Sequence, residues 1–406
     1  MPKKSHLHPS DLHGFSRMTI DAVAGLTDLV EAMHHNIAGT PALLGKPKPG
    51  RTSGVTGLVY HSIRGVTRLV GGGIDAVLGK LVPLFGEKHS SPEREAVLAA
   101  LNGVLGDYLE AGKNPLAIAM RLRRNGHPLQ ADGPALAAAF PQAGGRLLVL
   151  AHGLCMNDLQ WNRKGRDHGA ALERDLGYTP VYLHYNSGRH ISTNGREFAG
   201  VLETLVGNWP APIEELAILG HSMGGLLARS AWHYGTAAGH AWPRLLKKLV
   251  FLGTPHHGAP MERGGNWIDI ALGASPYTAP LSRLGKIRSA GITDLRHACL
   301  LDEDWHGRDR FARSGGHHKA LPLPENLACY AIAATTGRQA GDLKDRLIGD
   351  GLVPLDSALG RHKEAGRTLL FPESRQWIGY EMGHLDLLSR PEVYEQLRRW
   401  LDPAVG

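Results

Sequence analysis

The pentapeptide GHSMG at residues 220–224 constrains the fold of this 406-residue chain more than any other feature. The apolar run Leu216–Leu219 before it predicts a buried strand, and residues 225–232 after it predict a helix. A serine between a strand and a helix, with a glycine two positions away on either side, is the sequence context of a nucleophile elbow. In so tight a turn, side chains in place of the glycines would collide with neighbouring backbone. The alternative is an ordinary serine in a glycine-rich loop, so the prediction for Ser222 depends on finding its partners.

Candidate partners follow in the order serine, acid, histidine. A serine nucleophile needs a base, and the base needs an orienting acid. Residues 326–334 predict a core strand, and a loop beyond it carries Asp350 between two glycines. We expect a further strand around 368–371, continuing towards 378. His384 then lies on a glycine-flanked loop before residues 392–401, which predict the last helix.

Each partner has rivals. Asp345 lies in a charged run that is typical of a solvated face, and Asp356 is in a position to cap a following helix. His362 and His317 are alternative bases, but neither has the matching order of strand, loop and helix. Taken alone, an aspartate between glycines is more often a turn residue. The conjunction of three ordered signals favours Asp350 and His384.

An oxyanion hole requires two backbone N–H groups directed at the developing negative charge. Residues 146–151 predict a buried parallel strand that ends in His-Gly-Leu at 152–154. We therefore expect one donor from Leu154 and the other from Met223, the residue after the nucleophile.

Together these segments resemble the α/β-hydrolases of the lipase and esterase group. The resemblance rests on HGL at 152–154, GHSMG at 220–224, LGTPHHG at 252–258, GDGLVP at 349–354 and GH at 383–384. The LGTPHHG string is similar to the loop after the sixth strand in bacterial lipases and in the deacylases related to them. The resemblance covers roughly residue 116 to the C-terminus. It implies a mostly parallel central sheet flanked by helices, with Ser222 as nucleophile, His384 as base and Asp350 as acid. It also implies Leu154 and Met223 as the oxyanion donors.

The chain departs from some of these relatives at a calcium site near the catalytic histidine. Asp386 matches the acidic ligand, but Arg390 stands where those enzymes have a neutral amide. A fixed positive charge disfavours calcium. We therefore expect no metal and no cofactor.

Composition limits the class of protein and its location. The formal net charge of +7 is compatible with binding to anionic surfaces or acidic substrates, and also with a role in solubility alone. The sequence has no combination of aromatic and basic residues that is typical of nucleic-acid binding. The three cysteines are too few for a disulfide framework, although a pair between Cys299 and Cys329 stays open. Cys155 reads as a small buried residue. Because no secretory signal or membrane-spanning run is recognised, we expect a cytoplasmic protein, with peripheral contact at a lipid surface as an alternative.

We divide the chain into an N-terminal helical extension at 1–112 and a catalytic domain at 113–406. Residues 22–37 and 55–84 have the periodicity of amphipathic helices, with a linker at 45–54. These helices could add to the core, lie on lipid or form an oligomer interface. Gly71–Gly73 divide the second of these segments into two helices. A further helix is expected from Pro92 to about Ala111, and Asn125-Gly126 predicts a hairpin. Residues 260–324 form an insertion that predicts a cap or lid, with ungated surface helices as the alternative.

The leading functional hypothesis is a serine hydrolase that cleaves lipid-like or bulky carboxylic esters through an acyl-enzyme. Its partner would be a small-molecule or lipid ester, and the sequence leaves the oligomeric state open. The first alternative is an acyltransferase that uses the same triad. The second is a lipid-surface scaffold with a vestigial hydrolase domain, for which the N-terminal helices are the sole support.

Overall fold

The computed structural model describes residues 10, 11, 13, 14, 16–19, 21, 90, 92–259, 289–307, 321–339 and 349–402. The chain divides into two compact units, one of residues 1–94 and 109–117 and the other of residues 95–108 and 118–406. The predicted helices at 22–37 and 55–84 and the linker at 45–54 lie outside the described residues. So do 260–288 and 308–320 of the expected cap. The boundary at residue 112 and the cap therefore stay predictions.

Within the first unit, side chains tie the described N-terminal residues to the ends of α3 (Pro92–Ala111). Arg94 forms an ion pair with Asp11 at 2.7 Å. The guanidinium of Arg17 donates to the carbonyls of Gly112 and Lys113. The bounds of α3 agree with the helix predicted from Pro92 to about Ala111.

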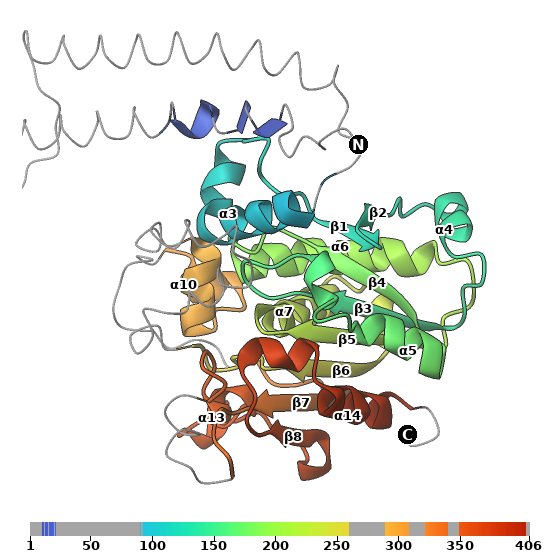
Figure 1. The fold of residues 1–406 in the computed structure, drawn as a ribbon, viewed down its shortest axis with the longest axis vertical. Coiled ribbons are helices and arrows are strands. Elements are labelled where there is room, and N and C mark those ends of the chain that lie inside the picture. Colours follow the sequence, from blue (N-terminus) through green and yellow to red (C-terminus); the bar gives the residue numbers. More distant parts are fainter. Residues whose placement is uncertain are drawn as a thin grey trace, which may run out of the picture. The chain divides into compact units, whose positions relative to one another are not determined.

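The second unit is built on an eight-stranded sheet with the order β2-β1-β4-β3-β5-β6-β7-β8 (Figure 1). β1 pairs antiparallel with both of its neighbours, β2 and β4, and all the other neighbouring strands pair parallel. Asn125 and Gly126 form the turn between β1 and β2 with φ of 52° and 76°, which confirms the predicted hairpin. The strands are β1 (Arg121–Arg124), β2 (His127–Pro128), β3 (Arg146–Ala151), β4 (Thr179–His184), β5 (Glu215–His221), β6 (Leu246–Leu252), β7 (Ala328–Ala334) and β8 (Gln376–Gly379).

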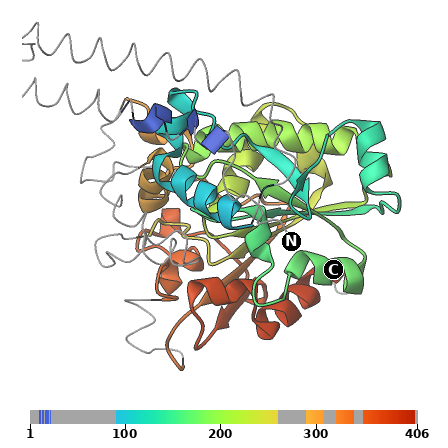
Figure 2. The same ribbon diagram turned by 45° about the horizontal axis from the view of Figure 1, so that its top comes forward.

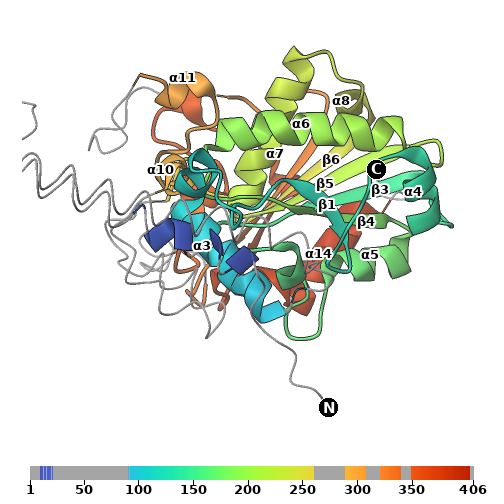
Figure 3. The same ribbon diagram turned by 90° about the horizontal axis from the view of Figure 1, so that it is seen from above.

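Helices cover both faces of this sheet. Figure 3 shows α6, α7 and α8 on one face and α5 and α14 on the other, and Figure 2 shows the same layers from another direction. The sheet is buried between them, so β3 and β5 are almost wholly apolar rather than alternating. The α-helices of this unit are α4 (Gly133–Ala139), α5 (His168–Leu176), α6 (Ile191–Gly207), α7 (Met223–Ala237), α8 (Trp242–Leu245), α10 (Ala290–His297), α11 (Asp302–Trp305), α13 (Leu355–Ala358) and α14 (Pro391–Leu401).

The chain reverses its direction of progress across the sheet at β3. From β3 it crosses to β4 on one side and then returns to β5 on the other side. Register places Ala151 of β3 opposite Gly220 of β5, and Gly220 opposite Phe251 of β6. The carboxyl ends of these strands are therefore level, and the loops that follow them meet at the switch point where ligands bind in open α/β sheets.

One strand prediction was wrong in its position. Residues 368–371 form no strand, and β8 begins at Gln376. Leu370 is 85% exposed, and Pro372 lacks the N–H that a ladder needs. Leu369 and Phe371 of this apolar run are buried, although they belong to a loop and not to a strand.

No helix within the described residues is long and apolar enough to cross a bilayer. The three cysteines are buried and none of them forms a disulfide, so the pair between Cys299 and Cys329 that the sequence left open is not formed.

Candidate active site

Ser222 occupies a strained turn between β5 and α7. Its backbone has φ 54° and ψ −123°, a conformation that residues other than glycine rarely adopt and that costs on the order of 1–3 kcal/mol. A Cβ on Gly220 would lie 2.6 Å from the backbone of Gly225, and one on Gly224 would lie 2.2 Å from the carbonyl oxygen of Ala151. Both glycines are therefore required, as the pentapeptide predicts for an elbow.

The hydroxyl of Ser222 is buried, and among the described residues it has no hydrogen-bond partner. Met223 is the first residue of α7, so its N–H has no partner inside the helix. A reacting group at Ser222 would therefore meet a free backbone donor and the positive end of a helix.

The structure brings Asp350 and His384 together. Asp350 Oδ2 lies 2.7 Å from His384 Nδ1, and both side chains are almost completely buried. The other carboxylate oxygen accepts the N–H groups of Leu352 at 3.0 Å and Val353 at 2.8 Å. Because Nδ1 donates to the carboxylate, Nε2 of His384 is left as an acceptor, which is the tautomer that a general base needs.

Backbone contacts bring these two side chains into register. The N–H of His384 donates to the carbonyl of Asp350 at 3.0 Å, so the acid and base loops are bonded through the main chain as well. Gly349 and Gly351 adopt φ of 57° and 95° on either side of the aspartate. A Cβ on Gly349 would lie 2.0 Å from the carbonyl oxygen of Val353, so the loop cannot close around Asp350 with a larger residue there.

The imidazole of His384 packs between Gly253 and a second histidine. A Cβ on Gly253, which has φ 56°, would lie 3.1 Å from the ring. The rings of His384 and His221 have centroids 4.7 Å apart. Burial holds the pKa of His221 well below its usual range, so this neighbour stays neutral beside the candidate base.

The loop after β3 lies against Ser222. A Cβ on Gly153 would be 3.0 Å from Cβ of Ser222, and the expected donor Leu154 is the next residue. Cys155 follows with φ 59° and donates its N–H to Ser187 Oγ at 3.1 Å. Burial raises the pKa of the Cys155 thiol to about 12, which makes it an inert filler.

Two further layers hold this oxyanion loop, which we define as residues 152–156. The hydroxyl of Tyr185 donates to the carbonyl of His152 at 2.9 Å and the two rings stack. Gly103 of α3 contacts the loop so closely that a Cβ there would lie 2.9 Å from both Cα and N of Cys155. Sequence reasoning missed Ser187, Tyr185 and Gly103. A glycine inside a helical pattern was the one available signal, since it marks a close approach of backbone.

A buried group of charged side chains lies beyond that loop. Arg123 of β1 contacts Glu95 at 2.8 Å and Asp158 at 3.2 Å. Asp158, in the 3-10 turn η1 (Asp158–Trp161), also lies 3.1 Å from His184 Nδ1. The contacts with Arg123 and His184 hold the pKa of Asp158 below its usual value against the opposing effect of burial. These bonds fix the segment that follows the oxyanion loop.

The rival residues that the structure describes lie apart from this cluster. Asp356 is in the first turn of α13 and pairs with Arg361. His362 Nδ1 accepts the N–H of Glu364. Asp345 and His317 lie outside the described residues.

Asp386, the residue that matches a calcium ligand, makes protein contacts. It accepts the N–H of Gly383 at 3.1 Å and pairs with Lys164 at 3.1 Å. Three or more metal-ligating side chains do not gather anywhere in the described part of the chain.

Two described pieces of the expected cap pack on the catalytic unit. Asp294 of α10 lies 3.0 Å from His190 Nδ1 and accepts the N–H of Ile191, which begins α6. Trp305 of α11 donates to Ser192 at 2.9 Å. These contacts hold a middle stretch of the insertion, residues 289–307, against the start of α6, and gating stays a prediction.

Comparisons with known proteins give one family match. The model of the PGAP1-like alpha/beta domain matches residues 143–321, and no curated protein matches the chain. Among solved structures, mature lipase BlEst2 of Bacillus licheniformis is 14% identical, with 70% of this chain and 97% of that chain covered and a TM-score of 0.42. EstA of Clostridium botulinum is 12% identical, with 64% and 87% covered and a TM-score of 0.38. Lipase B of Aspergillus fumigatus is 13% identical, with 66% and 57% covered and a TM-score of 0.37. The chain has the α/β-hydrolase fold, with a segment at 143–321 that is similar to the PGAP1-like alpha/beta domain.

Proposed function

We propose that this protein is a serine hydrolase that cleaves carboxylic esters. Ser222 Oγ attacks the ester carbonyl while His384 Nε2 accepts its proton. The carboxylate of Asp350 stabilises the imidazolium through its hydrogen bond to Nδ1. The N–H groups of Leu154 and Met223 stabilise the oxyanion.

The tetrahedral intermediate then breaks its bond to the alcohol oxygen, which receives the proton from His384. Water attacks the resulting acyl-enzyme with His384 again as base, and Ser222 is regenerated with release of the acid. Each protein group in this cycle is a side chain or a backbone N–H of the chain itself.

The observation that carries the proposal is the Asp350–His384 hydrogen bond of 2.7 Å in the same unit as a strained serine elbow. These residues are 34 positions apart in the chain. Burial of a carboxylate and an imidazole costs free energy, and such buried ionisable pairs are concentrated at functional sites. We assign lipid-like or bulky acyl esters as substrates because the insertion at 260–324 carries Trp267, Tyr277 and Trp305, large side chains that suit the lining of an acyl pocket. A cytoplasmic location is part of the proposal, because three scattered cysteines are too few for the disulfide framework of a secreted protein.

A fluorophosphonate probe tests the activated serine directly. We expect one adduct, on the peptide that contains Ser222, and we expect its formation to slow at least ~100-fold in His384→Ala because the base is removed. His362→Ala is the matched control and should label at the wild-type rate. Adduct on another serine, or equal labelling in both histidine variants, contradicts the assignment.

Turnover of nitrophenyl esters of increasing acyl length tests the reaction class. Ser222→Ala should retain the fold, judged by circular dichroism, and lose hydrolysis to the background rate. An added acceptor alcohol separates hydrolysis from transfer, because a transferase would yield the new ester rather than the free acid.

A further inference from the structure

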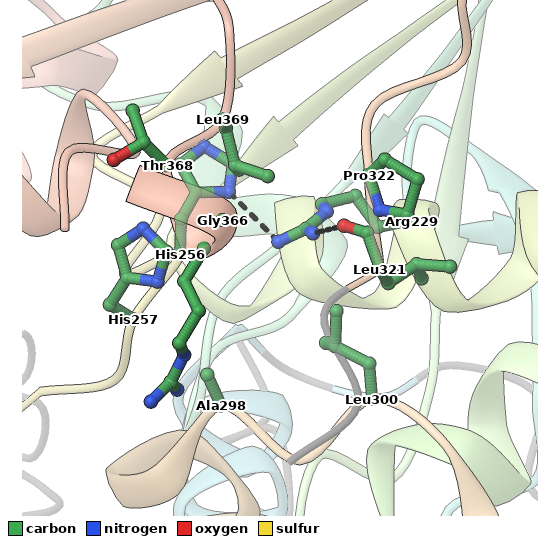
Figure 4. Close-up of a pocket in the computed structure, with 11 residues that line it drawn as sticks. Arg229, His256, His257, Ala298, Leu300, Leu321, Pro322, Gly366, Thr368 and Leu369 are labelled. Carbon is green, nitrogen blue, oxygen red and sulfur yellow. Dashed lines mark hydrogen bonds between the residues drawn. The ribbon is translucent and has the colours of Figure 1, made fainter. Parts of the chain in front are cut away.

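A second cavity, of about 280 Å³, lies outside the candidate triad and has a basic lining. We call it the basic pocket and define it by Arg229, His256, His257 and Arg367. Figure 4 shows Arg229 reaching from α7 towards His256, with Leu300, Leu321 and Leu369 around them. Arg229 lies on α7, six residues after its first residue Met223, about 9 Å along the helix axis. Neither Ser222 nor His384 lines this pocket.

The guanidinium of Arg229 is bound by neutral groups. It donates to His256 Nδ1 at 3.3 Å and to the carbonyl of Leu321. Because His256 accepts at Nδ1, its proton is on Nε2, which makes that nitrogen a donor. Among the described residues, neither His256 Nε2 nor Arg229 Nε has a hydrogen-bond partner. The side chains at this wall of the pocket therefore offer donors in excess of acceptors.

Positive charge in the pocket is not balanced by the residues around it. Arg229 is only 5% exposed, and within the described residues no carboxylate pairs with it or with Arg367. Burial lowers the pKa of Arg229 to about 10, so the guanidinium keeps its charge at neutral pH. Of the described residues that line the pocket, none is an aspartate or a glutamate. A buried, uncompensated cation is costly, and an anion would offset that cost.

We propose that the basic pocket binds a small organic anion, a carboxylate or phosphate group that carries a short apolar substituent. Arginine matches the geometry of both oxyanions through paired N–H donors. Leu300, Leu321 and Leu369 supply apolar surface for the substituent. The volume limits the ligand to a few heavy atoms beyond the charged group. This site does not depend on the proposed ester hydrolysis.

Calorimetric titration of the full-length protein tests the proposal with butyrate, inorganic phosphate and 1-butanol as probes. We expect saturable binding of at least one of the two anions, with a Kd of roughly millimolar order for so small a ligand. Butyrate alone would indicate a carboxylate site, and phosphate a phosphoryl site. Binding of 1-butanol should be at least tenfold weaker, because it fills the apolar surface without the charge.

Arg367→Gln is the decisive variant, since Arg367 is partly exposed and pairs with no carboxylate of the described residues. We expect it to weaken anion binding about tenfold. Arg361→Gln is the matched control on the neighbouring stretch of chain, because Arg361 pairs with Asp356 and does not line the pocket. Ser222→Ala should bind the anion as the wild type does, which separates this test from that of the hydrolase. The proposal is overturned if neither anion binds saturably, if 1-butanol binds equally well, or if the two arginine variants are indistinguishable.

Discussion

At the scale of single residues, the candidate site combines a turn formed by neighbours in the chain with a hydrogen bond between distant residues. The strain at Ser222 comes from its immediate neighbours, because the two glycines of the elbow are within two positions of it. The bond between Asp350 and His384 depends on two loops that the sheet brings together. The local sequence therefore predicts the elbow and explains why it forms, whereas Asp350 and His384 are predicted only from their order along the chain. Their catalytic roles stay predictions.

Asp350→Asn should lower kcat by about 10³–10⁴-fold with little change in stability. An amide retains the shape of the carboxylate, but its NH₂ group can donate to Nδ1, which would leave the proton on Nε2 and remove the base. Steady-state hydrolysis of a short nitrophenyl ester measures this loss. Asp356→Asn, at an exposed position in the first turn of α13, provides the control and should keep full activity. A comparable loss of kcat there would assign the role of the acid to Asp356.

At the scale of elements, α3 contributes to the site although it precedes the segment that matches the family model. Gly103 abuts Cys155, and the side chain of Ser289 donates to the carbonyl of Gly103 at 2.7 Å. Asn186, after β4, donates to the carbonyl of Gly106 at 2.9 Å. The helix thus packs on the loops that follow β3 and β4. The sequence predicted α3 and its length, but nothing in the local pattern indicated which loops it would support.

Gly103→Ala should impair turnover through the oxyanion loop. The new methyl group would lie within 3 Å of the backbone of Cys155, which must shift and carry Leu154 with it. Loss of one oxyanion donor lowers kcat by about 10²–10³-fold, so we expect a fall of at least ~10-fold in kcat with a smaller change in KM.

Gly200→Ala on α6 is the matched control for that change, because a Cβ there meets nothing within 4 Å. It should leave kcat unchanged and stabilise the helix by up to about 1 kcal/mol. Equal kinetics for the two alanine variants would show that α3 does not position the loop.

At the scale of the whole molecule, burial of neutral histidines links folding to pH. Burial lowers the pKa of His152 to about 3, and it lowers those of His221 and His256 well below the usual value. The unfolded chain binds protons at these residues near pH 6.5, whereas the folded chain does not. The stability that they contribute is therefore complete above pH 6.5 and is lost as the pH falls below it.

We expect the free energy of unfolding to fall by up to about 1.4 kcal/mol per pH unit for each of these histidines between pH 6.5 and the folded pKa. Urea denaturation from pH 7.5 to 4.5 measures the slope. His152→Gln should make the slope shallower than that of the wild type. If the slope is the same in His152→Gln, His152 does not contribute to the pH dependence of stability.

The sequence by itself determined the elements that arise from neighbours in the chain. The elbow, the Asn125-Gly126 hairpin and α3 follow from steric limits and periodicity that act within a few residues. The position of β8 escaped prediction because the apolar side chains of Leu369 and Phe371 are buried from a loop, and burial alone does not make a strand.

Only the tertiary structure decided which distant groups share an environment. It placed Asp350 against His384, Gly103 against Cys155, and the unbalanced charge of Arg229 beside a cavity. These relations depend on strand register and on which loops meet at the switch point of the sheet. Distances and burial across the fold are set by packing, and no local pattern encodes them.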